Sequence, residues 1–174
     1  MNTTTFRRCF IISFMLVILG CSTVISQATL TQILNSGPSS NRINMVFLSE
    51  GYTESQLSTF INTDATGMMN AYFATPPNNE YKNYYNVYAI SVASNESGSD
   101  HPSRGVFRDT YFNTTYDVAN IDRLLGCDWK GYLRADSLLQ HFMPEYDIAI
   151  MVINDPEYGG SGGGIAFVST YPGN

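Results

Sequence analysis

The spacing of apolar residues along the chain changes several times, and each change predicts a different element. Residues 43–48 are apolar at every position except Asn44, which is typical of a strand buried on both faces. Thr53 and Gln56 then form a capping box, and apolar residues follow at helical spacing, so we predict a helix that ends at Ala74. The folded region therefore begins with a strand followed by a helix.

The middle of the chain continues this alternation, with a long polar segment between its elements. Residues 84–92 are aromatic and β-branched, which predicts a second strand. The polar segment 93–120 follows, and within it we expect a short strand at residues 110–113. Apolar residues at helical spacing then predict a second helix, which ends at Pro144.

The strongest strand signal lies towards the end of the sequence. Residues 147–153 form a nearly continuous apolar run, and residues 165–170 form another strand after the glycine run 159–164. The order strand, helix, strand, helix, strand, strand predicts one α/β (α+β) domain whose crossovers are right-handed.

The first 28 residues have the layout of a secretory signal. Arg7 and Arg8 precede an apolar run that ends at Leu19, and small or polar residues follow. A membrane-spanning helix needs about 20 apolar residues, and this run is about half as long. We therefore predict an exported protein with residues 1–28 as its signal peptide, followed by a polar linker at residues 29–41.

Two cleavage sites stay open for this signal. Residues 18–21 (ILGC) resemble a bacterial lipobox in which Cys21 is lipidated, whereas residues 26–28 (SQA) suit ordinary signal peptidase. Acylation of Cys21 would attach the protein to a membrane without spanning it. We expect an extracellular, periplasmic or outer-membrane location in either case.

Composition and charge exclude several classes. With 44% hydrophobic residues the chain can bury a core, so disorder is excluded. The 15 Asp and Glu outnumber nine Lys and Arg, which removes the electrostatic basis for binding nucleic acid. Cys127 is the one cysteine outside the signal, so we expect no disulfide framework and interpret Cys127 as buried filler.

The remaining candidates for chemistry carry weak signals. His101 and His141 are too far apart to bind a metal together on one helix, and we interpret both as structural. Asp155 and Glu157 follow a strand, where α/β proteins often keep carboxylates, although Asn-Asp-Pro is first a turn former. The glycine run lacks the ending of a P-loop, so it is interpreted either as a flexible connection or as a thin rim that another backbone can approach.

Three blocks in order carry a family resemblance. Residues 44–53 (NMVFLSEGYT), then 86–88 (NVY) with 94–102 (SNESGSDHP), then 158–163 (YGGSGG) resemble the IgA peptidase family of secreted zinc metallopeptidases. The resemblance covers residues 42–174. It implies the N-terminal part of a metzincin-like catalytic domain: a twisted mixed sheet with backing helices, acting on a protein or peptide substrate.

The resemblance also implies a zinc-binding His-Glu-x-x-His helix directly after the strand at residues 165–170. No such motif occurs in this sequence, so no metal ligand and no catalytic residue is transferred to a numbered position. We expect the zinc ligands beyond Asn174, which makes the chain a truncated fragment that is inactive by itself.

What the resemblance implies for the residues present is a substrate-binding rim. In metzincin-like folds an extended substrate pairs with a rim strand, which we place at residues 164–169. Asp100 is expected to organise the neighbouring loop or to bind a structural cation. The predicted substrate-binding residues are Gly162, Gly163, Gly164, Ile165, Ala166 and Phe167. A non-catalytic exported lipoprotein that binds or adheres through a peptidase-like domain is the alternative.

Overall fold

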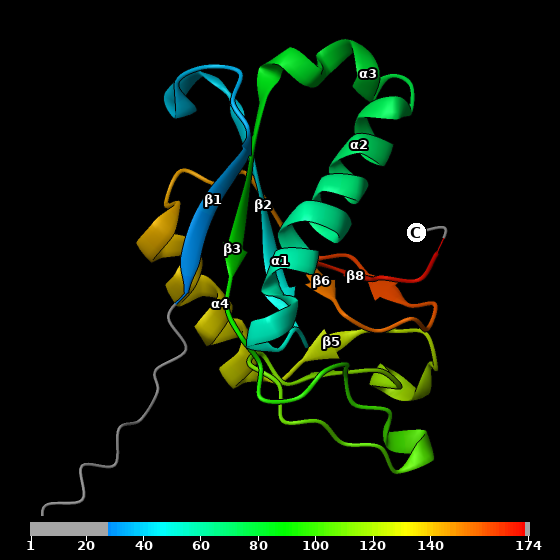
Figure 1. The fold of residues 1–174 in the computed structure, drawn as a ribbon. Coiled ribbons are helices and arrows are strands. Elements are labelled where there is room, and N and C mark those ends of the chain that lie inside the picture. Colours follow the sequence, from blue (N-terminus) through cyan, green and yellow to red (C-terminus); the bar gives the residue numbers. More distant parts are fainter. Residues whose placement is uncertain (1–27, 173–174) are drawn as a thin grey trace, which may run out of the picture.

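A six-stranded mixed sheet forms the centre of the molecule (Figure 1). The computed structural model describes residues 28–172. The strand order is β1-β3-β2-β6-β8-β7, with β2, β3, β6 and β8 parallel and the edge strands β1 and β7 antiparallel to their neighbours. The strands are β1 (Thr29–Leu34), β2 (Ile43–Glu50), β3 (Tyr85–Ser91), β6 (Ile148–Ile153), β7 (Gly160–Ser161) and β8 (Ala166–Ser169). The predicted α/β class with a mixed sheet is confirmed.

One long helical run and one separate helix accompany the sheet. The helices are α1 (Leu57–Thr59), α2 (Thr66–Ala74), α3 (Asn78–Tyr81) and α4 (Trp129–Phe142), with a π-helical stretch (Phe60–Ala65) joining α1 to α2. Short 3-10 turns lie at Ser39–Asn41, Glu54–Gln56, Lys82–Tyr84, Pro102–Arg104 and Val118–Asn120. The predicted capping box is present, because the Thr53 backbone N–H donates to Gln56 Oε1 at 3.0 Å. Both predicted helices are confirmed.

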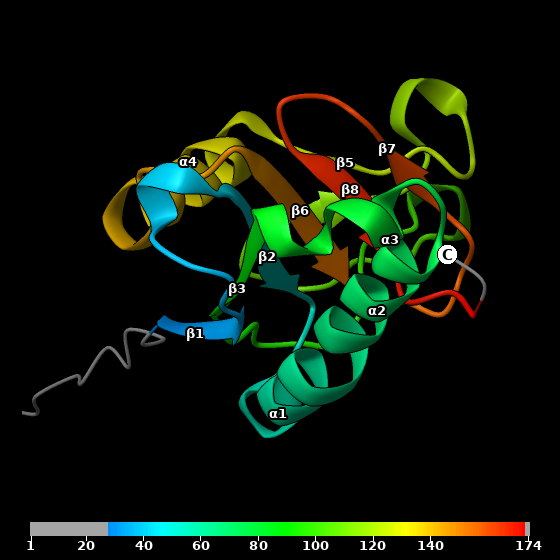
Figure 2. The same cartoon turned by 90° about the horizontal axis from the view of Figure 1, so that it is seen from above.

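The helices cover opposite faces of the sheet, which explains the continuous apolar character of the central strands (Figure 2). Met45 and Phe47 of β2 pack in the core beneath α2, whereas Val46 and Leu48 pack in the core beneath α4. Successive side chains of a strand point to opposite faces, so a strand between two helical layers is apolar at every position. The interior position predicted for residues 43–48 is confirmed, since β2 lies between β3 and β6.

Residues 29–41 are not a linker, and this prediction is wrong. β1 pairs antiparallel with β3, with Leu30 opposite Ile90, and a 3-10 turn follows it. The sequence signal in residues 29–34 (TLTQIL) is weak, because polar and apolar residues do not alternate strictly and the pairing register shifts between Gln32 and Leu34. Because polar residues surround this short segment, its sequence predicts a linker.

The long segment 93–128 folds at one end of the sheet around a small second sheet. Its strands are β4 (Thr114–Thr115) and β5 (Gly126–Cys127), which pair antiparallel. The short strand that we expected at residues 110–113 therefore lies further along the chain. Residues 110–114 instead donate hydrogen bonds to a buried carboxylate, described below, which replaces regular pairing there.

The predicted signal at residues 1–28 and the lipidation of Cys21 fall almost entirely outside the described residues. Within residues 28–172, no helix is long and apolar enough to cross a membrane.

Candidate functional site

The parallel strands end at one edge of the sheet, and polar side chains gather there. Glu50 closes β2, Asn154 and Asp155 follow β6, and the segment 93–128 lies across this edge (Figure 1). In open α/β sheets, ligands are bound outside the carboxyl ends of the strands. The candidate site therefore includes this edge, whereas the glycine loop that connects β7 to β8 lies at the amino ends of the parallel strands and is a separate region.

Glu50 is the most deeply buried charge at this edge, with none of its surface exposed. Its carboxylate accepts hydrogen bonds from Thr110 Oγ1 at 2.6 Å, from the Phe112 N–H at 2.9 Å and from the Thr114 N–H at 3.0 Å. Burial raises the pKa of Glu50, and these hydrogen bonds oppose that rise. One side chain thus fixes the backbone of residues 110–114 against the end of β2.

A second buried pair joins the loop after β3 to the loop after β6. His101 Nε2 lies 2.9 Å from Asp155 Oδ2, and both residues are less than a tenth exposed. The His101 ring is stacked on Tyr116, with 4.3 Å between ring centroids and 13° between planes. Tyr116 Oη in turn donates to the Glu157 carbonyl at 2.8 Å. The ring of His101 is therefore held by a carboxylate and by an aromatic face.

Arg104 and Glu157 close the outer side of this cluster. The two guanidinium nitrogens Nη1 and Nη2 each lie 2.5 Å from a Glu157 carboxylate oxygen, which is a bidentate pair. Hydrogen bonding to Arg104 holds the pKa of Glu157 below its ordinary value. A hollow of about 350 Å³ opens between these side chains and the residues that follow β6. We call His101, Arg104, Asp155 and Glu157 the polar cluster.

Asp100 organises the same loop, as the sequence suggested. Its Oδ1 accepts the Arg108 N–H at 2.6 Å, its own N–H donates to the Thr114 carbonyl at 3.0 Å, and its carbonyl accepts the Tyr116 N–H at 2.8 Å. These bonds connect Asp100 to both ends of β4.

β8, the strand predicted as the rim, is not an outermost strand of the sheet. β8 is parallel to β6 on one side and antiparallel to β7 on the other, with Ser161 opposite Phe167 and Gly160 opposite Val168. β7 is in turn held from outside, because the Gly160 N–H donates to the Arg123 carbonyl at 3.0 Å. The expectation that β8 offers a free edge for strand addition is therefore wrong, since the chain's own glycine run folds back onto that edge.

The six predicted substrate-binding residues are divided by this arrangement. Gly162, Gly163 and Gly164 form an exposed loop between β7 and β8, which we call the glycine loop. Ile165 and Phe167 are buried in the core on the α4 side, at 8% and 2% exposure. Ala166 is half-buried in β8. The glycine loop is the most exposed part of this set, and its contact with a substrate stays a prediction.

A family model for IgA Peptidase M64 matches residues 31–171. The chain belongs to the IgA peptidase M64 family. The match begins within β1, so the family domain includes the segment that we had predicted as linker. No curated protein matches the sequence. Membership makes the protein a peptidase by family, with proteins or peptides as its substrates.

M64 peptidases are metallopeptidases in general, and the described residues of this M64 chain do not fit a metal. Within residues 28–172, no group of three or more His, Cys, Asp or Glu side chains is arranged to hold one. In the polar cluster, His101 Nε2 is already bound to Asp155, and Glu157 is bound to Arg104. The polar cluster therefore has a structural role, because it joins the loop after β3 to the loop after β6.

The polar cluster and Glu50 are the features that sequence reasoning missed in this M64 chain. Asp155 and Glu157 were weak candidates, and the interpretation of His101 as a structural loop residue agrees with its buried position. Glu50 gave no signal apart from a carboxylate at the end of an apolar strand, which is an unusual place for an unpaired charge. Cys127 packs against the α4-side core, and burial raises the pKa of its thiol to about 12, so it is an inert side chain.

Proposed function

We propose that this chain forms the substrate-binding part of an exported zinc metalloendopeptidase. The observation that carries the proposal is the M64 family match over residues 31–171, which covers the whole sheet from within β1 to β8. The family gives the reaction class, hydrolysis of peptide bonds. The geometry of the described residues then supports a particular role for the glycine loop.

Neither packing nor backbone conformation within the chain requires glycine in the glycine loop, which supports a contact with another molecule. A Cβ built on Gly162 or on Gly164 would meet no atom within 4 Å, and neither residue has a positive φ. Gly51 differs, because its φ is +69° and a Cβ there would clash with the Gly98 carbonyl. Absence of a side chain lets another backbone approach closely. We propose that an extended substrate lies along residues 162–164.

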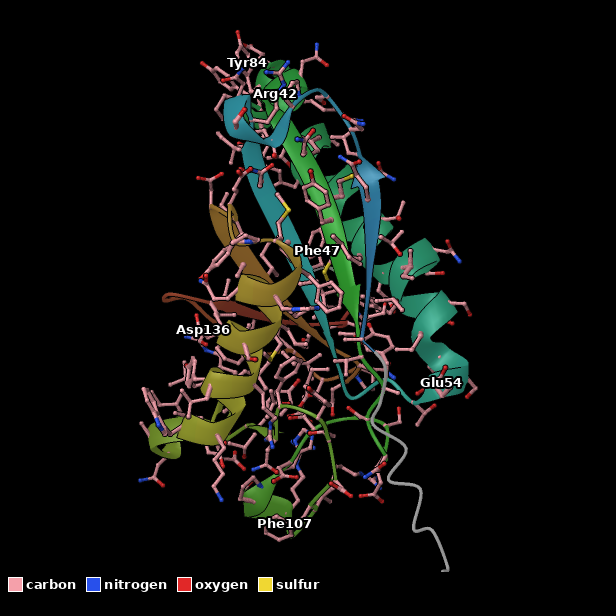
Figure 3. All side chains as sticks on the ribbon, turned by 90° about the vertical axis from the view of Figure 1, so that its left-hand side faces the viewer. Arg42, Phe47, Glu54, Tyr84, Phe107 and Asp136 are labelled. Atoms are coloured by element: carbon pink, nitrogen blue, oxygen red, sulfur yellow. The ribbon has the colours of Figure 1, made fainter. Side chains whose placement is uncertain are left out.

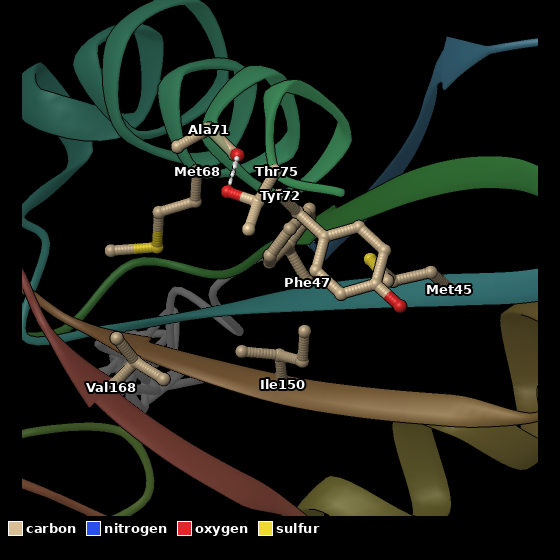
Figure 4. A pocket seen from close by; sticks show the side chains of 8 residues that line it. All are labelled: Met45, Phe47, Met68, Ala71, Tyr72, Thr75, Ile150 and Val168. Carbon is tan, nitrogen blue, oxygen red and sulfur yellow. Dashed lines mark hydrogen bonds between the residues drawn. The ribbon is translucent and has the colours of Figure 1, made fainter. Parts of the chain in front are cut away.

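We propose further that the zinc ligands belong to a helix that packs in the trough between α2 and the sheet (Figure 4). This hollow of about 440 Å³ lies beside β8. Its walls are apolar, which suits the apolar face of an amphipathic helix. The side chains that line it include Met45, Phe47, Ile150 and Val168 from the sheet, and Met68 and Tyr72 from α2.

Export is proposed from the sequence of residues 1–28, with either a lipidated Cys21 or complete removal of the signal. Metabolic labelling with a radioactive fatty acid separates the two routes. Label that is lost in Cys21→Ser supports the anchor, whereas label that persists in Cys21→Ser, or that is absent from the parent protein, excludes it.

Hydrolysis by the complete gene product tests the enzyme proposal. We expect it to cleave an unfolded protein substrate, to lose this activity to a zinc chelator, and to regain it when zinc is added back. Hydrolysis that a chelator does not affect would reject the metallopeptidase.

The alternative is a non-catalytic exported protein that binds through exposed aromatic side chains. Tyr81 and Tyr84 favour it, because they are 51% and 60% exposed and flank a hollow of about 600 Å³. This hollow lies at the end of the sheet that is opposite to the polar cluster. Binding to a glycan or protein that survives chelation, without any hydrolysis, would favour this function.

A further inference from the structure

An exposed aromatic face on α4 lies next to the glycine loop. Trp129, Tyr132, Leu133 and Asp136 are spaced i, i+3, i+4 and i+7, so they share one side of the helix. Gly131 and Ala135 are buried on the neighbouring side of the helix, and the buried Leu139 lies next to this face. Trp129 is 74% exposed, Leu133 50% and Tyr132 38%, which leaves a large apolar surface in water.

This face and the glycine loop together enclose a hollow of about 270 Å³. The hollow is lined by Gly164 and Ile165 on the loop side, by Tyr146, and on the helix side by Trp129, Tyr132, Leu133, Asp136 and Leu139. Its volume lies just below the range of about 300–1,000 Å³ typical of small-molecule pockets, so it suits a single long side chain. Tyr132 is held in place by an edge-to-face contact with Phe167, at 5.8 Å between centroids.

Asp136 gives the hollow its charge. It is exposed, and within residues 28–172 its carboxylate has no hydrogen-bond or ion-pair partner. The neighbouring cation, Arg134, is directed instead towards the ring of Tyr111, at 5.9 Å from its centroid. An unpaired carboxylate beside two exposed aromatic rings is complementary to a cation on an apolar stem. The net charge of −6 of the whole chain also attracts basic partners.

We infer that this hollow binds a basic side chain, arginine or lysine, of a polypeptide that lies along the glycine loop. The inference rests on the proposed function, because the substrate is the polypeptide that would bring this side chain. An extended chain directs alternate side chains to opposite faces of a sheet, so every second residue of such a substrate points to the α4 side. The aromatic rings pack on the aliphatic stem and on the cation, and Asp136 pairs with the charge.

Tryptophan fluorescence gives a direct test, because Trp129 is the only tryptophan in the chain. The probes are three capped heptapeptides of glycine and alanine that differ only in a central arginine, norleucine or glutamate, titrated into the full chain with a chelator present. We expect a saturable blue shift with the arginine peptide, a weaker response with norleucine and none with glutamate. Added salt should weaken only the arginine response.

Charge-neutral variants then test the role of the carboxylate. Asp136→Asn should weaken binding of the arginine peptide about threefold to fivefold and leave the norleucine peptide unchanged. Glu54→Gln is the matched control, because Glu54 is an exposed acid on the far side of the molecule (Figure 3). It should change neither titration.

Four results would overturn the inference. Equal binding of arginine and norleucine peptides, or no effect of Asp136→Asn, would remove the charge recognition. No shift with any peptide would remove the site. A neutral oligosaccharide that shifts Trp129 at lower concentration than the arginine peptide would assign the aromatic face to a glycan.

The same variants separate this inference from the proposed function. Arginine-peptide binding by a gene product that never hydrolyses protein would reject the enzyme and keep the pocket. Zinc-dependent hydrolysis with no preference for basic residues, unchanged in Asp136→Asn, would keep the enzyme and reject the pocket.

Discussion

The segment 93–128 and the glycine loop at residues 162–164 are both irregular, but they are held in opposite ways. Glu50 and Asp155 hold the first through buried, hydrogen-bonded side chains, and the partly buried Asp100 adds a further hydrogen bond. The glycine loop is exposed, and its Cβ positions meet almost nothing. Buried charges are costly unless they are fully paired, so the first loop has one conformation that the fold depends on. The second loop is free to be shaped by a partner.

The largest effect is expected where the anchored loop depends on one carboxylate. Glu50→Ala leaves three donors of residues 110–114 buried without an acceptor, so we expect the free energy of unfolding to fall by about 3 kcal/mol or more. Urea denaturation followed by circular dichroism measures this. Glu54→Ala, an exposed acid four residues away, should change it by less than about 0.5 kcal/mol. A loss below about 1 kcal/mol in Glu50→Ala would show that the loop is held by other contacts.

A smaller effect is expected from the polar cluster. Asp155→Asn keeps the size of the side chain but removes the charge next to His101, so we expect a loss of about 1–3 kcal/mol in the same denaturation experiment. Asp109→Asn is the matched control, because Asp109 is exposed and the new amide oxygen can still accept the hydrogen bond from the Asn95 side chain. If both variants are equally stable, the pair of His101 and Asp155 contributes nothing to the free energy of unfolding.

The pH dependence of stability should show the Arg104–Glu157 pair. The pKa of Glu157 is lower in the folded protein than its ordinary value of 4.5. Its contribution is therefore complete above pH 4.5 and is lost as the pH falls through the lower folded value, because the unfolded chain binds the proton more tightly. Between about pH 3 and 6, the unfolding temperature should rise less steeply with pH in Glu157→Gln than in the parent. Parallel curves for the two proteins would contradict this.

The smallest effect on stability is expected in the glycine loop. Gly162→Ala and Gly164→Ala add a methyl group in open space, so the free energy of unfolding should change by about 0.5 kcal/mol or less, in either direction. Substrate affinity should fall, because the methyl group keeps a second backbone away. Gly51→Ala is the opposite case and should destabilise strongly, since its Cβ would overlap the Gly98 carbonyl. Alanine variants of the glycine loop with unchanged hydrolysis and binding would exclude a contact with substrate.

The central strands and both helices could be predicted because their signals are local. Residues 43–48 and 147–153 are apolar on both faces, and the capping box of Thr53 and Gln56 marks a helix start whatever surrounds it. The family could also be recognised, because its sequence blocks are short continuous segments that lie in β2, in β3 with the loop after it, and in β7 with the glycine loop.

The remaining features depend on contacts between distant residues. The pair of His101 and Asp155 joins positions 54 residues apart, and no spacing rule predicts it. The edge position of β7 was missed because two residues are too few for a strand pattern. β8 was therefore expected at the edge, although its strand character was predicted correctly. The helices and strands follow from local sequence, whereas the order of neighbouring strands in the sheet depends on contacts between residues far apart in the chain.

The two borders of the sheet have a consequence for how copies of this protein behave together. β1 has an irregular register between Gln32 and Leu34, and β7 is two residues long and already bonded through Gly160. Bulges and short outer strands are devices that deprive a neighbouring chain of a template for backbone pairing. Concentrated solutions should accordingly resist fibril growth that spreads by strand-to-strand joining.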